Sequence, residues 1–125
     1  MSWVVEFCED YFPEVKALAP AVRRELLVQV HVLRQFGPNL GRPQVDTLYG
    51  SRHSNMKELR FQADGGVWRI AFAFDWQRHA VLLVGGSKAG VSSSRFYKLL
   101  IKAADSRFDR HLGRLQKEMD NANNA

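Results

Sequence analysis

Two strand-like runs separated by a tight turn constrain the fold of this 125-residue chain more than any other feature. Residues 56–62 and 67–74 have the pattern of strands, and the second run alternates large apolar side chains with arginine and alanine. Between them stands the dipeptide Asp64-Gly65, which favours the left-handed backbone of a two-residue hairpin turn. The sequence therefore predicts an antiparallel β-hairpin in the middle of the chain.

This hairpin gives the two faces of the sheet different characters. With the turn at this place, Phe61 lies opposite Trp68, and Arg60 lies opposite Arg69. The aromatic face is predicted to be core. On the other face two adjacent guanidinium groups repel one another unless a negative group is near. Two interpretations stay open: a concave basic surface with room for an anionic ligand, or ion pairs with Glu58, which is on the same face.

Positive charge is concentrated in the middle of the sequence. Residues 51–102 contain nine Lys and Arg against three Asp and Glu, whereas residues 1–50 contain five against six and residues 103–125 contain four against four. Such an asymmetry favours a nucleic acid or an acidic protein as the partner. The alternative is a solvated basic surface without a task.

The rest of the chain predicts helices and strands around the hairpin, in a single α+β domain over residues 1–125. Neither a repeat nor a linker divides the sequence. The expected elements are a strand at 3–7, a helix that starts near Pro13, a longer helix that starts at Pro20 and ends at 36–38, a connecting loop at 37–55, a third meander strand at 80–86, a short helix capped within 92–94, a last helix from about Lys102 and a frayed tail at 120–125.

Composition excludes several classes of protein. Apolar residues make up 46% of the chain and charged residues 25%, which is typical of a soluble globular protein. No stretch approaches the roughly 18–20 apolar residues of a membrane span, and the N-terminus has no basic segment of a signal peptide. Lone Cys8 predicts a buried thiol in a reducing cytoplasm. The histidines stand apart, so we expect no metal, and no Gly-rich stretch is long enough to bind phosphates, so we expect no nucleotide cofactor. We expect His31, His79 and His111 at the surface.

Four stretches of the sequence carry a resemblance to a known family. They are GPNLGRPQVDTLYGSRHSNMKELRF (37–61), WRIAFAFD (68–75), AVLLVGGSK (80–88) and FYKLLIKAADSRFDRHL (96–112). These stretches resemble the RelE/ParE toxin superfamily, and within it the HigB-like branch, also described as phage-derived Gp49-like proteins. The resemblance implies a RelE-like fold: a strand, two N-terminal helices, an antiparallel three-stranded meander that completes a small sheet, and a C-terminal helix.

The resemblance implies a toxin of a type II toxin–antitoxin system, most simply a ribosome-dependent mRNA endonuclease that needs no metal. Its partners would be mRNA, the ribosome and a helix-turn-helix antitoxin of the HigA type, with which it would form a hetero-oligomer. Two alternatives stay open, because one fold hosts several functions. One is a ParE-like inhibitor of DNA gyrase without enzymatic activity, and the other is a non-toxic regulatory partner of the antitoxin.

Metal-free RNA cleavage needs few groups. The ribose 2′-hydroxyl attacks the adjacent phosphate, and the enzyme aligns the attack, stabilises the negative charge and assists proton transfer. Arginine suits the second task because guanidinium binds phosphate oxygens in pairs. The resemblance implies catalytic roles for Arg69 as phosphate ligand, for Lys88 and for Tyr97, and Arg60 joins them because it shares the face of Arg69. We expect RNA contacts from Lys57, Arg52, His53 and Arg95, with His53 also a candidate acid or base.

Overall fold

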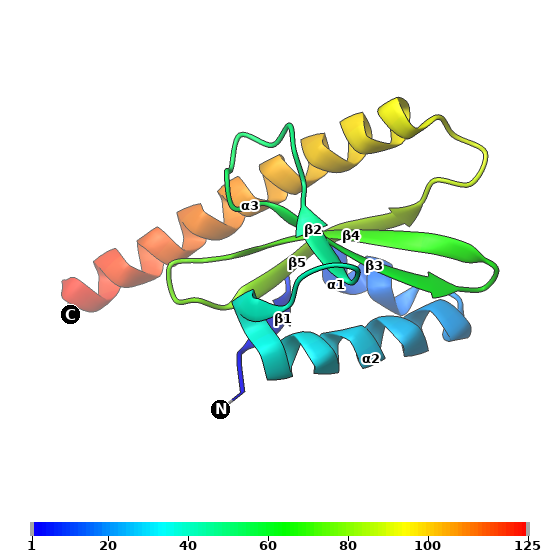
Figure 1. Ribbon diagram of the computed structural model, residues 1–125. Helices are drawn as coiled ribbons and strands as arrows, with labels where there is room; N and C mark the ends of the chain where they lie inside the picture. The colour runs from blue at the N-terminus through cyan, green and yellow to red at the C-terminus, as the bar shows by residue number, and fades with distance from the viewer. Residues whose placement is uncertain (1, 125) are drawn as a thin grey trace.

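The computed structural model describes residues 2–124 and places a five-stranded sheet between two long helices that cover its opposite faces (Figure 1). The strand order is β1-β5-β4-β3-β2, with β1 parallel to β5 and the other neighbours antiparallel. The predicted α+β class is confirmed. The elements are β1 (Val5–Phe7), α1 (Tyr11–Lys16), α2 (Pro20–Phe36), the 3-10 turn η1 (Gly37–Asn39), β2 (Val45–Thr47), β3 (Lys57–Ala63), β4 (Gly66–Phe74), β5 (Ala80–Ser87) and α3 (Ser93–Asn123).

The β3–β4 hairpin has the register that the sequence predicts. Arg60 pairs with Arg69, and the two turn residues have positive φ angles, 51° at Asp64 and 75° at Gly65. Glycine adopts such an angle without strain, and aspartate tolerates it better than most residues. The turn thereby fixes which side chains of the two strands share a face.

Residues 37–55 are more ordered than the predicted connecting loop. They contain η1 and β2, and β2 pairs antiparallel with β3. The sequence does not reveal β2, because a three-residue edge strand is too short for a period-two pattern and stands among Gly and Pro. Its position brings Asp46 opposite Glu58.

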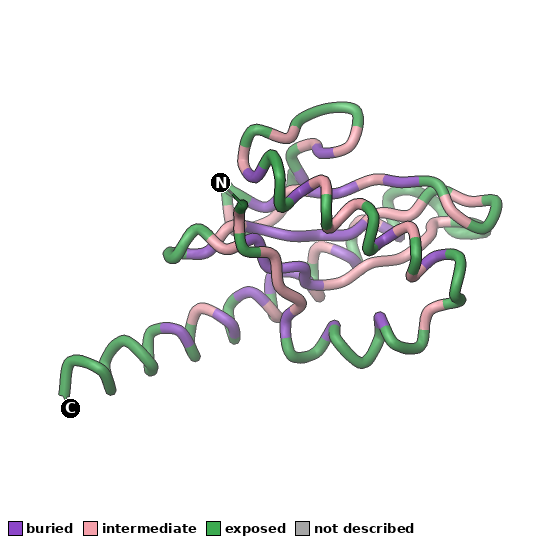
Figure 2. The backbone as a smooth tube through the Cα atoms, turned by 90° about the horizontal axis from the view of Figure 1, so that it is seen from below, coloured by how far each residue is buried: buried purple, intermediate pink, exposed green. Residues whose placement is uncertain are grey.

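The C-terminal helix α3 is continuous from Ser93 to Asn123, where the sequence predicts two helices and a frayed tail from 120. The predicted cap is confirmed, because the Ser92 hydroxyl accepts a hydrogen bond from the Arg95 amide. Up to Leu115 the side chains of α3 that face the sheet are buried, and the last turns of the helix are exposed (Figure 2).

The two faces of the sheet are covered differently. Helix α2 buries Val22, Leu26 and Leu33 on the aromatic face. Helix α3 covers the middle of the other face, where Ala71 and Ala73 are fully buried because their small side chains let the helix approach. The basic surface predicted on this face is therefore open only at the end nearest the β3–β4 hairpin.

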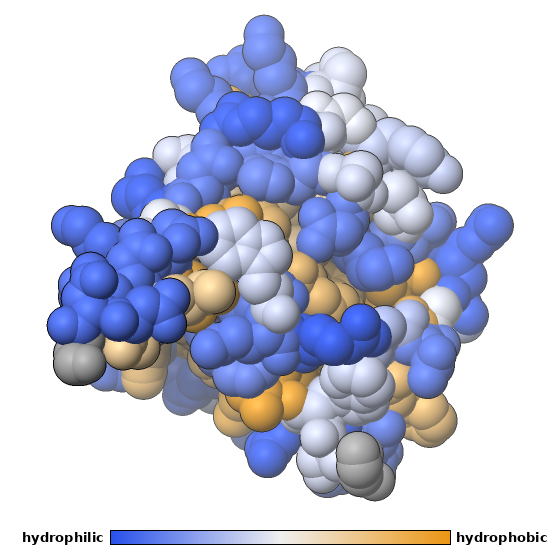
Figure 3. All heavy atoms as spheres, turned by 90° about the vertical axis from the view of Figure 1, so that its left-hand side faces the viewer, coloured by the Kyte–Doolittle hydropathy of each residue, from blue (hydrophilic) through white to orange (hydrophobic). Residues whose placement is uncertain are grey.

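The C-terminal half of α3 is fastened to the beginning of the chain by three ion pairs. Arg107 donates to both Glu14 oxygens, at 2.9 and 2.5 Å. The other two pairs are Arg110 with Asp10 and Arg114 with Glu9. The end of the molecule where both termini lie is mostly hydrophilic (Figure 3).

His111 is buried, and its prediction as a surface residue was wrong. Its Nε2 lies 2.8 Å from Oδ2 of Asp75, a carboxylate that also accepts hydrogen bonds from the amides of Gln77 and His79. Asp75 thus holds the β4–β5 turn and α3 together.

Cys8 is buried, as predicted. Within residues 2–124, no helix has the length and apolar character needed to cross a bilayer.

Candidate functional site

The open end of the basic face centres on the paired arginines of β3 and β4. The Arg60 side chain is one-third exposed, and its nearest acids are Glu58 at 3.6 Å and Asp46 at 3.8 Å. Arg69 has no acid within ion-pair distance among the described residues. The interpretation that ion pairs neutralise the arginines therefore holds for Arg60. Among the described residues Arg69 has no such partner, so the interpretation of an anion-binding surface stays open there.

Tyr97 of α3 lies next to Arg69 and contacts Glu58, the acid beside Arg60. Its hydroxyl donates to Oε1 of Glu58 at 3.2 Å, and the guanidinium of Arg69 lies 5.9 Å from the centre of its ring. Partial burial, and then the negative charge of Glu58, raise the pKa of the Tyr97 phenol above its ordinary value. The phenol therefore stays protonated at neutral pH and acts as a hydrogen-bond donor.

Both arginines retain unused hydrogen-bonding capacity. The Nε atoms of Arg60 and Arg69 are buried without a hydrogen-bond partner, and the Arg69 guanidinium donates only a long bond, 3.5 Å, to the Val67 carbonyl. Buried donors are seldom left without an acceptor, because they lose water on burial. Two neighbouring donors in this state suit an anion with several oxygens, such as a phosphate.

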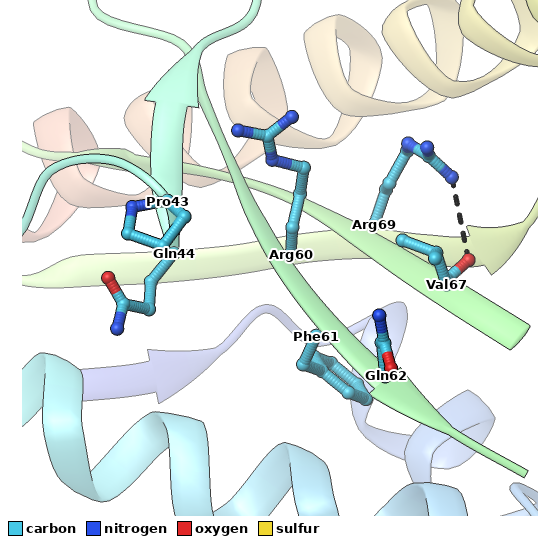
Figure 4. A pocket seen from close by; sticks show the side chains of 7 residues that line it. All are labelled: Pro43, Gln44, Arg60, Phe61, Gln62, Val67 and Arg69. Atoms are coloured by element: carbon cyan, nitrogen blue, oxygen red, sulfur yellow. Dashed lines mark hydrogen bonds between the residues drawn. The ribbon is translucent and has the colours of Figure 1, made fainter.

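Two hollows meet at Arg69. The first, about 360 Å³, lies beside Pro43 and is lined by both arginines, which point to the same side of the sheet while Phe61 points to the other (Figure 4). The second is lined by Arg69 and Lys88 together. The Lys88 ammonium donates to the Ser93 hydroxyl at 2.8 Å, a contact that the sequence did not suggest. Arg60, Arg69, Lys88 and Tyr97 are thus brought to one place, called here the basic cluster.

The other predicted RNA-contact residues lie elsewhere. Lys57 pairs with Phe72 and lies on the opposite face of the sheet from Arg60. Arg52 and His53 both contact Asp109 of α3, and the ion pair with Arg52 lowers the pKa of Asp109. These two residues fasten the loop after β2 to α3.

Sequence reasoning missed Asp46 of this site and did not recognise the full role of Glu58. Glu58 was considered only as an ion-pair partner of the arginines, yet it is buried and accepts the Tyr97 hydroxyl. Asp46 belongs to β2, the strand that the sequence did not predict. Alternation along β3 could have suggested Glu58, since it shares a face with Arg60. Among residues 2–124, no group of three or more His, Cys, Asp or Glu side chains is placed to hold a metal ion.

The fold is of the RelE-like class. The structure is similar to the E. coli toxin RelE, solved in the free state as a double arginine-to-alanine mutant, with a TM-score of 0.57 over 81% of this chain and 95% of that one, at 13% identity. It is also similar to an archaeal RelE in a RelE–RelB complex from Pyrococcus horikoshii, with a TM-score of 0.52 over 73% and 100% of the two chains, at 17% identity. At these identities the likeness concerns the fold alone.

The chain belongs to the family described as phage derived protein Gp49-like (DUF891), whose model matches residues 13–109. Two relatives come from Mycobacterium tuberculosis (strain ATCC 25618 / H37Rv). Putative toxin HigB2 is 49% identical over 88 residues, which cover 70% of this chain and 43% of HigB2. Putative toxin HigB3 is 42% identical over 104 residues, which cover 80% of this chain and 89% of HigB3. The match thus spans less than half of HigB2 and most of HigB3, and the predicted resemblance is confirmed.

Proposed function

We propose that this protein is the toxin of a type II toxin–antitoxin system and cleaves mRNA on the ribosome. The observation that carries the proposal is the basic cluster, in which two adjacent arginines with unbonded Nε atoms lie beside a protonated tyrosine. The family relatives named as putative toxins support the same class. We place its action in the cytoplasm, where mRNA is translated.

The proposed reaction uses the chain's own side chains and no metal. The 2′-hydroxyl gives its proton to solvent water as the 2′-oxygen forms a bond to phosphorus. The bond from phosphorus to the 5′-oxygen breaks, which leaves a 2′,3′-cyclic phosphate and a 5′-hydroxyl. Arg69 binds the non-bridging oxygens, and Lys88 stabilises the charge that develops on them. Before the reaction Glu58 holds the Tyr97 phenol and the Arg60 side chain in place. The protonated phenol then turns its O–H from Glu58 to the leaving 5′-oxygen, gives that oxygen its proton, and is reprotonated from water.

An antitoxin is the second proposed partner. We expect a helix-turn-helix protein of the HigA type to form a hetero-oligomer with this chain and to cover the basic cluster. The similar archaeal RelE was solved in complex with RelB. Reduced chemical modification of Arg69 and Lys88 in the complex would support coverage of the cluster, and unchanged modification would contradict it.

The test is to express the wild type, Arg69→Ala and Arg24→Ala in growing cells and to map mRNA 5′ ends over several minutes. Arg24 is the control because it is exposed on α2. We expect 5′-hydroxyl ends within translated codons for the wild type and Arg24→Ala, and a loss of about 100-fold or more in Arg69→Ala, since a group that stabilises transition-state charge contributes this much.

Other outcomes point to the alternatives. Growth arrest with intact mRNA and induced DNA repair would contradict the nuclease and indicate gyrase as the target. Normal growth would indicate a regulatory partner without toxicity. Circular dichroism of purified Arg69→Ala checks that the variant folds, which we expect because Arg69 lies at the open end of the sheet.

A further inference from the structure

The hollow of about 360 Å³ at the basic cluster extends past the two arginines toward the tip of the β3–β4 hairpin. Beyond Arg60 and Arg69 its lining continues with Gln62 and Val67, which form the next cross-strand pair on the same face. The Gln62 amide nitrogen points to the side of the arginines, and the Phe61 ring points away from them (Figure 4). An amide and an apolar side chain therefore stand together beside the two guanidinium groups.

The side chains of this pair are open to a ligand. Gln62 is exposed, and its amide takes part in none of the hydrogen bonds formed among residues 2–124. Val67 is 37% exposed. A nucleobase has an apolar face and an edge of donors and acceptors. A bare valine beside an amide with one acceptor and two donors matches both parts of a base.

The position of Gln62 along β3 decides which nucleotide it can meet. Glu58, Arg60 and Gln62 share a face, with the arginine in the middle. Tyr97 is bonded to Glu58, so the leaving 5′-oxygen of the proposed reaction lies on the Glu58 side of the phosphate. In an in-line displacement the attacking oxygen approaches from the opposite side. The nucleotide that supplies the 2′-hydroxyl therefore lies on the Gln62 side, about 7 Å along the strand from the arginine.

The amide of Gln62 favours one base. Its oxygen can accept from the 6-amino group of adenine while its nitrogen donates to the neighbouring ring nitrogen. Arginine favours guanine instead, but the guanidinium of Arg60 lies beside two acids and that of Arg69 faces the phosphate. Gln44 also lines the hollow, but its amide points away from the arginines (Figure 4). Gln62 is thus the residue of the hollow placed to read a base edge.

We propose that Gln62 and Val67 form the subsite for the base immediately 5′ of the cut, and that this subsite selects adenine. The face of adenine packs on Val67, its edge bonds to Gln62, and the 3′-phosphate of its nucleotide lies at Arg69. This inference rests on the proposed function, because the proton donor Tyr97 sets the direction of the RNA. It adds to that function a preference for one base at one position.

Binding of mononucleotides tests the subsite without cleavage. Adenosine 3′-monophosphate carries the base and the phosphate in the proposed relation. In an NMR titration of the isotope-labelled wild-type protein, this nucleotide should bind about tenfold more tightly than cytidine 3′-monophosphate, because the pyrimidine edge does not match the amide in the same way. It should also shift the side-chain amide signals of Gln62.

Three variants separate the edge of the base from its face. Gln62→Leu removes the hydrogen bonds and keeps a similar size, so the ratio of the two dissociation constants should fall to about twofold or less. Gln35→Leu makes the same change at an exposed position of α2 and should keep the wild-type ratio. Val67→Ala removes a contact that every base shares, so it should weaken both nucleotides about threefold and leave the ratio unchanged. Thermal unfolding of each variant checks its folding.

Several results would overturn the subsite. Equal dissociation constants for the adenine and cytosine nucleotides would do so, and so would a Gln62→Leu protein that keeps the wild-type ratio. Tighter binding of guanosine 3′-monophosphate than of the adenine nucleotide would show that an arginine, rather than Gln62, reads the base. Absence of saturable binding by any of these nucleotides would also contradict the proposal.

Mapped cleavage sites separate this inference from the proposed function. In cells, cuts should follow adenine about tenfold more often than the base frequencies of translated codons predict, and Gln62→Leu should remove that excess while cutting continues. Cuts without a preference for adenine on their 5′ side would leave the nuclease standing and overturn the subsite. Uncut mRNA, together with binding of adenosine 3′-monophosphate that depends on Gln62, would overturn the nuclease and confirm a nucleotide-binding site.

Discussion

In the later half of α3, taken from Arg107 onward, three arginines each contact an acid of residues 9–14. In the earlier half Arg95, Lys98 and Lys102 form no ion pair within the described part of the chain. The later half is a structural clamp, and the earlier half leaves its cations exposed to solvent. Both halves carry cationic side chains. The role of a cation is decided by whether an acid from a distant segment lies within reach of it.

The comparison extends to the sheet. Arg60 and Arg69 occupy paired positions, but Arg60 has Glu58 and Asp46 beside it, and Arg69 has neither. The arginine without an acid is the one at which two hollows meet. Cations without an acidic partner among the described residues therefore occur at two places, at Arg69 on the sheet and on the outer face of the earlier half of α3.

The largest difference between the two halves of α3 should appear on truncation of an apolar side chain. Phe108 in the clamped half is 2% exposed, so Phe108→Ala should lower the free energy of unfolding by about 3–5 kcal/mol. Leu99 in the other half is mostly exposed, and Leu99→Ala should change the free energy of unfolding by about 0.5 kcal/mol or less. Urea unfolding followed by circular dichroism measures both, and equal losses would show that the halves are packed alike.

A smaller effect is expected for cations. Arg107→Met keeps much of the apolar stem but removes the bonds to Glu14 and to the Leu83 carbonyl, so it should lower the free energy of unfolding by about 2 kcal/mol. Its mRNA cleavage per folded molecule should stay near that of the wild type. Lys98→Met, at an exposed position without an ion pair among the described residues, should change the free energy of unfolding by about 0.5 kcal/mol or less. A stable Arg107→Met protein would contradict the structural role of the clamp.

The smallest expected effect is the pH dependence of the clamp. A hydrogen bond from Arg110 lowers the pKa of Asp10, so the folded protein binds fewer protons there than the unfolded chain. The stabilisation is present at neutral pH and is lost as the pH falls below about 4, the ordinary aspartate range. Asp10→Asn should therefore lose less stability between pH 6 and pH 3 than the wild type, measured by urea unfolding. Asp64→Asn, in the exposed hairpin turn, should behave as the wild type does.

Short sequence motifs correctly predicted those features of the fold that are determined by residues close together in the sequence. The Asp64-Gly65 turn set the register of β3 with β4, and the Ser92 cap marked the start of α3. The continuity of α3 was missed, although its buried side chains keep helical spacings of three and four, from Phe96 and Leu100 through Ala104, Phe108 and His111 to Leu115. Strand β2 exists mainly through its pairing with β3 and carries little signal of its own.

The site was predictable as a set of residue types but not as a geometry. Arg60 and Arg69 followed from the hairpin, and Lys88 and Tyr97 followed from resemblance. Contacts between distant segments decided the rest. Asp109 contacts Arg52 and His53 from more than fifty positions away, and Asp75 contacts the buried His111 across 36 positions. No pattern within a short stretch of sequence reports such pairs.

The clamp joins an earlier segment of the sequence to a much later one. Residues 9–14 are translated before their partners at 107–114. Among the described residues strand β1 pairs with β5 alone, and β5 is also translated later. Because contacts this distant in sequence form late in folding, a chain that stops before residue 107 lacks the clamp that fixes α3, the helix that carries Tyr97. The order of synthesis therefore keeps the basic cluster unassembled until residues 107–114 have been made.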